Sequence, residues 1–228
     1  MNLARDVWDA FTSPFANGPQ QTWQTIKLAM SALALAAVAG LTLGVAATRF
    51  GRVGSYVIQA IGHLGRMVPT LGIMALVAAL WTIGFWPAVI ALIALGIAPI
   101  LLNTYTGIRD VDPTAIGAAR GMGLTSPQIL LKVSLPLAAP LIFAGLRTAT
   151  NEVIATAALG AFVGADGLGV IIQSGLGNLQ TAELLAGAIP IAALALTTDG
   201  LLAVVERTCT PKGLRLARRQ AKQQGRLA

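Results

Sequence analysis

Ionisable side chains stand inside several apolar stretches of this sequence, where a charge is costly and therefore informative. On membrane-insertion scales a charged side chain at a helix centre costs roughly 2.5 to 3.5 kcal/mol, so each such residue is a candidate for function. Arg147 and Glu152, five residues apart, could neutralise one another within or between helices, or could act directly on a solute or a gate. Asp199 stands more alone, and a structural partner and a place in a solute pathway are equally open for it. A cationic solute would favour the carboxylates over the arginines.

Other candidates surround a predicted kink and a glycine-rich stretch. His63 and Arg66 precede Pro69, where gating and packing are alternative interpretations. Six glycines between Gly160 and Gly177 predict irregular, closely approached backbone, such as a re-entrant or gating segment. The full set of candidates for a pathway or a gate is His63, Arg66, Pro69, Glu152, Asp166, Gly167, Gly169 and Asp199.

The sequence predicts no catalytic residue, cofactor or metal site of its own. The single cysteine, Cys209, excludes an intramolecular disulfide and a cysteine metal cluster, and the single histidine has no ligand partner of its kind. A GxxxxGK[ST] phosphate loop does not occur, so the chain is not expected to bind ATP in the usual way. Any energy for transport must therefore come from a partner.

The composition is that of a membrane protein. Of 228 residues, 55% are hydrophobic and 11% are charged, and the mean hydropathy is +0.73. Soluble domains carry roughly a quarter charged residues. The net charge of +7 does not predict nucleic-acid binding, because the basic residues flank apolar segments and form no soluble patch interleaved with aromatic residues. The N-terminus lacks the short apolar core of a cleavable signal peptide, so we expect the first membrane helix to direct targeting.

Apolar runs predict an all-α protein with five membrane spans, since one span takes about 20 residues. An aromatic, irregular lead-in over residues 1–20 is expected at the membrane interface. The second span is expected to be one kinked helix, and Trp81, Phe85 and Trp86 after it form either an interfacial belt or a cage for a quaternary ammonium ion. The membrane domain covers 21–206, with spans at 22–48, 55–81, 87–106, 138–162 and 183–206, and a basic tail follows at 207–228.

The positions of lysine and arginine predict the orientation of these spans. If the tail is cytoplasmic, five spans place the N-terminus outside, and twelve of the sixteen basic residues then lie on the cytoplasmic side. That bias favours an N-out, C-in topology. The tail is also expected to bind anionic membrane lipid. The twelve residues are Arg49, Arg52, Arg109, Arg120, Lys132 and the seven of the tail.

A polar island between the third and fourth predicted spans carries its own helix signals. Asp112, before a proline, is typical of an N-cap, and Gly123 stands where a helix would end in a left-handed residue. Ser126, again before a proline, repeats the start signal. These signals predict two short helices with a glycine corner, closed off by Pro136 and Pro140. This cytoplasmic hairpin would either dock a soluble partner or rest on lipid headgroups through its apolar side, Ile116, Met122, Leu124, Ile129 and Leu130.

Residues 114–145, TAIGAARGMGLTSPQILLKVSLPLAAPLIFAG, resemble the EAA loop of binding-protein-dependent ABC importer permeases. The family pattern is Glu-Ala-Ala, a glycine a few residues on, and then Leu-Pro. Gly117 departs from it, because the family usually has Glu there. The resemblance implies that the loop over 108–136 forms coupling helices seated in a cleft of a cytoplasmic ATPase subunit. The residues implied in this coupling are Ala118, Ala119, Arg120, Gly121, Gly123, Leu135 and Pro136.

The resemblance extends over about residues 21–206 and is strongest to permeases of osmoprotectant importers, which carry glycine betaine, choline, carnitine or proline betaine. Two stretches carry it, GFWPAVIALIALGIAPILLNTYTGIRDVDPTAIGAARGMG and VIATAALGAFVGADGLG. The family typically has Gly where Asp166 stands in this chain, and often Gln where Arg66 stands. Both differences add charge near the presumed pathway.

The resemblance implies a methionine-importer-like permease fold in the bacterial inner membrane and no enzymatic activity in this chain. It further implies a second permease subunit, identical or not, ATPase subunits that bind ATP and Mg, and an extracytoplasmic substrate-binding protein. An alternative within this class is the import of another small solute, such as an amino acid. From a different class, the alternative is a channel or a membrane scaffold that needs no ATPase.

Overall fold

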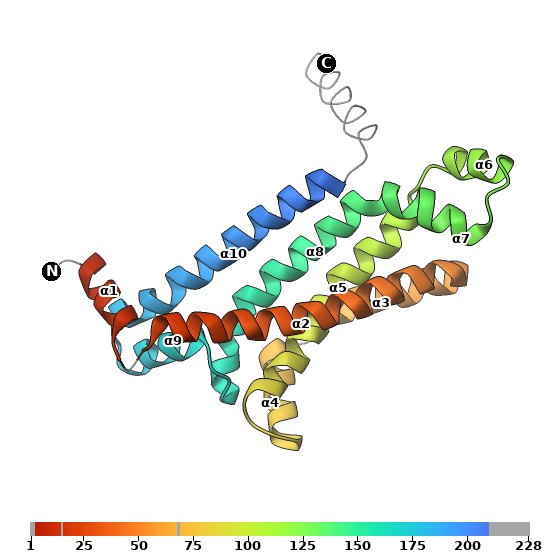
Figure 1. The fold of residues 1–228 in the computed structure, drawn as a ribbon. Helices are drawn as coiled ribbons and strands as arrows, with labels where there is room; N and C mark the ends of the chain where they lie inside the picture. Colours follow the sequence, from red (N-terminus) through yellow and green to blue (C-terminus); the bar gives the residue numbers. More distant parts are fainter. Residues whose placement is uncertain (1–2, 15, 68, 210–228) are drawn as a thin grey trace, which may run out of the picture.

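The computed structural model describes residues 3–14, 16–67 and 69–209, and its regular elements there are all helices. Four helical stretches are long and apolar enough to cross a membrane: Gly18–Phe50, Phe85–Arg109, Ser126–Val163 and Thr181–Thr208. They run side by side (Figure 1), and a helical hairpin projects from one end of the bundle. The structure thus confirms the predicted all-α membrane class.

Helix α5 (Phe85–Arg109) lies at the centre of the bundle, between α2 (Gly18–Ala47) and α8 (Leu135–Ala157). Glycines let the backbones approach closely, as is usual between membrane helices. A Cβ on Gly40 of α2 would lie 2.8 Å from a methyl carbon of Ile100, and one on Gly145 of α8 would lie 2.8 Å from the Pro99 carbonyl oxygen. The central packing therefore depends on residues without a side chain.

The largest buried cluster lies toward the end of the bundle opposite the hairpin. It joins Leu28 of α2, Leu92 of α5 and Val153 of α8 to the short helices α4 (Thr70–Leu80) and α9 (Leu168–Gly177). Its side chains are fully buried: the exposed fraction of Leu92 is 0% and that of Leu28 is 1%. This end is consequently the best-packed part of the chain.

The predicted second span is two helices in the structure, where the sequence suggested a single kinked one. After a 3-10 turn, Thr48–Phe50, the chain forms α3 (Gly51–Met67), and α4 starts after Pro69. Pro69 has φ −67° and ψ 119°, an extended conformation, and its carbonyl accepts the first hydrogen bond of α4 from Ile73. Because proline has no N–H to donate, a break at this position costs little backbone pairing. Neither helix reaches the about 20 residues of a straight span.

The N-terminal lead-in is also more regular than the sequence suggested. Residues Leu3–Thr12 form helix α1, which packs against α10 (Thr181–Cys209). Val7, Ala10 and Phe11 of α1 contact the buried cluster, at the spacing of three and four residues that places side chains on one helix face. Trp8, on another face, is 64% exposed. An amphipathic pattern, present in the sequence, thus explains the helix.

The glycine-rich stretch confirms the predicted close approach of backbone. It consists of a 3-10 helix, Ala158–Val163, and the ten-residue helix α9, which packs between α10 and the start of α2. A Cβ on Gly175 would lie 2.6 Å from the backbone nitrogen of Leu184, and one on Gly169 would overlap the Ala158 carbonyl. Its role as a re-entrant or gating segment stays a prediction.

The close contact at Gly145 can be tested by adding one methyl group. Gly145→Ala is expected to lower stability by about 1 to 3 kcal/mol, because the new Cβ would meet Asn103 and the Pro99 carbonyl. The matched control is Gly200→Ala on α10, where a Cβ has no neighbour within 4 Å. Since alanine is the better helix former, this control should be neutral or stabilising. Melting midpoints of the purified protein in detergent, followed by tryptophan fluorescence, measure both; equal midpoints would contradict the packing argument.

Candidate functional site

The helical hairpin starts as the sequence predicts. Its first helix, α6 (Pro113–Gly121), has Asp112 as N-cap, and the Asp112 carboxylate accepts a hydrogen bond from the Thr114 backbone N–H at 2.8 Å. That bond, together with a second from the Thr114 hydroxyl, holds the pKa of the Asp112 carboxyl below its usual value. The cap is therefore a charged carboxylate at neutral pH, which also suits the positive end of the helix dipole.

The corner of the hairpin is the predicted glycine. Gly123 has φ +82°, in the left-handed region, and its N–H donates to the Arg120 carbonyl at 3.0 Å. The Leu124 N–H donates back to the Ala119 carbonyl at 3.2 Å, so the last carbonyls of α6 are satisfied. The second helix, α7 (Ser126–Ile129), begins one residue earlier than predicted, since Thr125 is its N-cap. The Gln128 side chain accepts the Thr125 N–H at 2.8 Å and completes a capping box.

The prediction that Pro136 and Pro140 close off the hairpin is wrong. Helix α7 continues through a π-helical turn, Leu130–Ser134, directly into α8, which contains both prolines. A π-turn adds a residue to the helical repeat, and such turns can accommodate a residue that disrupts the regular hydrogen-bond pattern. The hairpin is thus joined to a membrane-spanning helix by one uninterrupted helical stretch, Ser126–Val163.

The candidate coupling residues fall into an exposed tip and a partly buried base. Four of them, Ala118, Arg120, Gly121 and Gly123, are exposed, whereas Ala119 is buried. Leu135 and Pro136 are half-buried where the π-turn meets α8. Of the predicted apolar side, Ile129 is buried and Met122 is 74% exposed. Sequence reasoning missed Leu131, which is 64% exposed, because the π-turn shifts the helical phase there.

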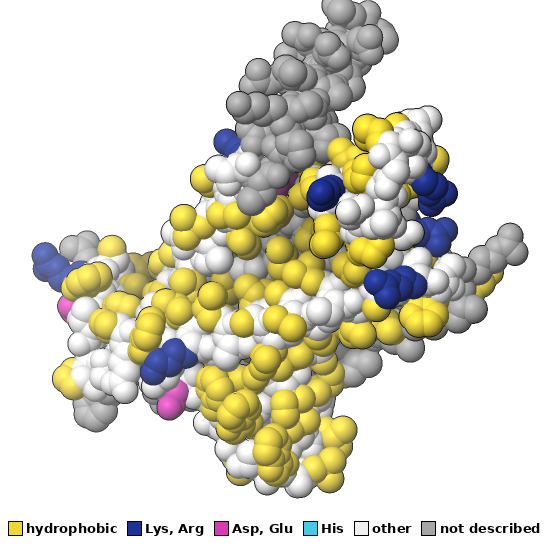
Figure 2. Space-filling model, turned by 45° about the vertical axis from the view of Figure 1, so that its right-hand side comes forward, with side chains coloured by type: hydrophobic (Ala, Val, Ile, Leu, Met, Phe, Trp, Pro, Cys, Tyr) yellow, Lys and Arg dark blue, Asp and Glu magenta, His cyan; other side chains and the backbone are white. Residues whose placement is uncertain are grey.

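Basic side chains surround the hairpin. Figure 2 shows lysine and arginine gathered at this end of the molecule, and the exposed residues there include Arg49, Arg120 and Lys132. Arg109, at the end of α5, donates to the Tyr105 hydroxyl at 3.2 Å and reaches the Gly51 carbonyl at 3.5 Å. The base of the hairpin therefore contacts the corner between α2 and α3. The tail from residue 210 onward lies outside the described residues.

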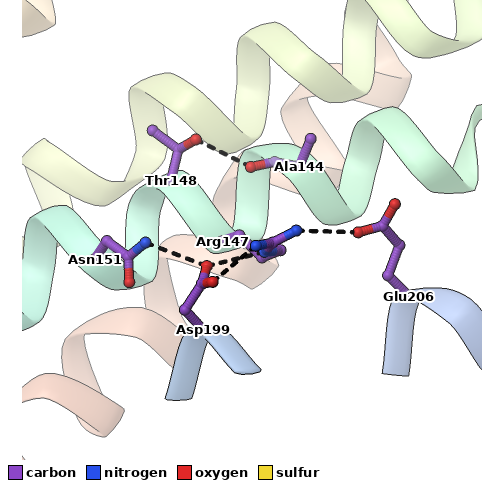
Figure 3. A network of polar contacts seen from close by, with 6 residues as sticks. All are labelled: Ala144, Arg147, Thr148, Asn151, Asp199 and Glu206. Atoms are coloured by element: carbon purple, nitrogen blue, oxygen red, sulfur yellow. Dashed lines mark hydrogen bonds and ion pairs between the residues drawn. The ribbon is translucent and has the colours of Figure 1, made fainter. Parts of the chain in front are cut away.

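Arg147 is the centre of a half-buried polar network between α8 and α10 (Figure 3). Its guanidinium donates to both carboxylate oxygens of Asp199, from Nε at 2.9 Å and from Nη2 at 2.7 Å. Glu206 accepts from Nη1 at 3.4 Å, and the Asn151 amide donates to Asp199 at 3.3 Å. The partners of Arg147 are thus two carboxylates of α10, where the sequence suggested Glu152 from α8 itself.

Asn151 and Glu206 were not among the candidates predicted from the sequence, although their spacing from Arg147 and Asp199 points to them. Asn151 follows Arg147 by four residues, and Glu206 follows Asp199 by seven, so each pair shares one helix face. Asp199 is consequently paired and not isolated. Glu152 is half-buried on α8, next to Asn151.

The remaining pathway candidates lie elsewhere. Asp166 is exposed before α9, whereas Gly167 and Gly169 are buried at its start. The Gly167 N–H donates to the Gln21 side chain at 2.7 Å, and the Leu168 N–H donates to the Thr25 hydroxyl at 2.8 Å. Gln21 and Thr25 belong to α2 and were not predicted from the sequence, and they accept the hydrogen bonds of the N–H groups at the start of α9. The side chains of His63 and Arg66 lie outside the described ones, so a gate at these residues stays a prediction.

The possible metal ligands and the aromatic residues after α4 are the last groups to consider. No group of three or more His, Cys, Asp or Glu within the described residues could hold a metal ion. Phe85 and Trp86 pack edge to face with centroids 5.7 Å apart, and both are exposed, as is Trp81. The aromatic belt and the cation cage both stay predictions.

Known permeases resemble the chain along most of its length. It is 38% identical over 198 residues to the carnitine transport permease protein OpuCB of Listeria monocytogenes, covering 87% of this chain and 90% of that protein. The choline transport system permease protein OpuBB of Bacillus subtilis is 39% identical, with 85% and 89% covered.

The fold matches a chain of the MetNI methionine ABC transporter, solved in inward-facing conformations. The TM-score is 0.72 at 21% sequence identity, and the match covers 84% of this chain and 95% of that chain. The prediction of a methionine-importer-like fold is confirmed. Residues 25–210 match the family model described as "Binding-protein-dependent transport system inner membrane component". The chain therefore belongs to the family of binding-protein-dependent transport system inner membrane components.

Proposed function

We propose that this chain is the permease subunit of an ATP-driven importer for quaternary-ammonium osmoprotectants such as carnitine, choline and glycine betaine. The observation that carries the proposal is the 38 to 39% identity, over 85% or more of the chain, to permeases named for carnitine and choline transport. The substrate would arrive on an extracytoplasmic binding protein and cross between this chain and a second permease subunit, identical or different.

In this proposal the hairpin binds an ATPase subunit, and movement of that subunit displaces the hairpin. ATP and Mg would bind to that subunit, and this chain would supply neither a cofactor site nor a catalytic residue. Support comes from the exposed side chains of the hairpin, where Met122 at the tip and Leu131 in the π-turn offer apolar contacts among basic side chains. The unbroken helical stretch from α7 into α8 gives a continuous path by which a displaced hairpin would move a membrane span.

The proposed topology places the hairpin in the cytoplasm and α1 and α9 outside, in the bacterial inner membrane. The gathering of lysine and arginine at the hairpin end supports this orientation, since such residues are retained on the cytoplasmic side. The opposite end, with α1, α9 and the loop between α4 and α5, would then face the binding protein. The exposed aromatic residues of that loop suit a membrane interface.

Uptake measurements test the proposed transport activity. The complex that copurifies with this chain from its native membrane is reconstituted in liposomes with its binding protein. We expect ATP-dependent accumulation of radiolabelled carnitine, choline or glycine betaine, and none of methionine. Uptake of an amino acid alone would contradict the substrate class. Flux of choline without ATP, or a complex that contains no ATPase, would contradict the importer mechanism.

The hairpin corner can be tested at a single position. Gly123 has φ +82°, and a Cβ there would have no neighbour within 4 Å, so a substitution acts on the backbone alone. Gly123→Val is expected to displace α7 and to weaken ATPase binding about five- to thirtyfold, because a β-branched residue disfavours the left-handed region by roughly 1 to 2 kcal/mol. Gly123→Asn is the control, since asparagine tolerates this conformation.

Copurification of the ATPase and uptake are measured for both variants. The expected order of ATPase recovery is wild type, then Asn, then Val. Equal recovery with all three residues would show that the corner geometry does not serve docking.

A further inference from the structure

The second half of α10 packs less tightly against the bundle than the first half. Its buried residues, Ala186, Gly187 and Ile191, all lie in the first half, and no described side chain from 192 to 208 is buried. Fully buried contacts therefore hold only the start of α10, and the side chains of its remainder that face the bundle, such as Thr198, are half-buried. The looser half of this 29-residue helix thus has fewer buried apolar contacts that would make it follow α8.

The Arg147 network adds a polar attachment in this loosely packed half. The carboxylates of Asp199 and Glu206 are seven residues apart, about two helical turns, and both reach the same guanidinium. Arginine suits this position because its planar fork can hold Asp199 with two parallel bonds and still direct a third donor to Glu206. One side chain of α8 thus spans two turns of α10 (Figure 3).

The helix that carries Arg147 is the one that continues from the hairpin. From Ser126 to Val163 the chain is helical without a break, and Arg147 lies within this stretch. A displacement of α7 would therefore reach Arg147 through the helix backbone and reach α10 through the guanidinium.

We propose that Arg147 is a positioning residue that makes the second half of α10 move together with α8 when the hairpin is displaced. This inference rests on the proposed coupling of the hairpin to an ATPase. The competing account is that the network only neutralises charges that would otherwise be costly within a membrane span.

A neutral version of the network separates the two accounts. The triple variant Arg147→Met, Asp199→Asn, Glu206→Gln removes every charge of the group while keeping similar shapes. If Arg147 acts by positioning, the complex should assemble and hydrolyse ATP, and solute imported per ATP should fall about tenfold, within the range of coupling effects between sites. If neutralisation is its whole role, the triple variant should import solute per ATP like the wild type, and the proposal is overturned.

A charge-swapped pair keeps the proposal testable if the neutral variant fails to assemble. Arg147→Asp combined with Asp199→Arg rebuilds an ion pair between α8 and α10. The proposal expects this double variant to recover most of the import per ATP that Arg147→Asp alone loses; recovery of assembly without recovery of that ratio overturns it. Thr148→Ala is the matched control, because the exposed Thr148 hydroxyl bonds only within α8, to the Ala144 carbonyl at 3.0 Å.

The wild-type complex distinguishes failure of this inference from failure of the proposed function. If the wild type hydrolyses no ATP and imports no osmoprotectant, the importer assignment fails and takes the inference with it. If the wild type imports and the neutral triple variant does so at the same ratio, only the role of Arg147 fails.

Discussion

A protein backbone in lipid must satisfy its hydrogen bonds internally, and each proline in an apolar segment removes one of them. The chain meets this constraint differently at different prolines. At Pro69 the helix stops and a new one begins, whereas α5 and α10 pass through Pro99 and Pro190. Before Pro136 the helix widens into a π-turn and continues. The position of the break and the position of the π-turn together decide where the helical path is interrupted and where it continues.

Local chemistry made the hairpin largely predictable, because its signals lie within a few residues of the structures they form. Asp112 caps the helix that follows it, and Gly123 takes the left-handed conformation that glycine adopts readily. The same local reasoning failed at Pro136, because a proline usually marks a helix end. The π-turn that absorbs it has no simple signal in the residues Leu130–Ser134, and so the continuity of α7 with α8 could not be predicted from them.

The polar contacts of the candidate site were less predictable, because their partners are distant in sequence. Spacing along one helix pointed from Arg147 to Glu152, yet Asp199 is 52 residues further along the chain. The contact of Gln21 with Gly167 joins residues 146 apart. Such pairs depend on which helices are neighbours in space. The cost of a charge within a membrane span still indicated, from the sequence alone, that Arg147 and Asp199 each need a partner or a function.

These elements also show where the helical path along the chain is continuous and where it turns. The helical stretch that begins in the hairpin ends at Val163, and the chain then turns at Gly167, whose φ of +146° and contact with Thr25 exclude a side chain. One continuous helical stretch therefore runs from the hairpin to the far end of the bundle, beside α9. Arg147 lies between these two ends and connects α10 to the same stretch. In its second half, α10 contacts this stretch through half-buried side chains and through the ion pairs of Arg147.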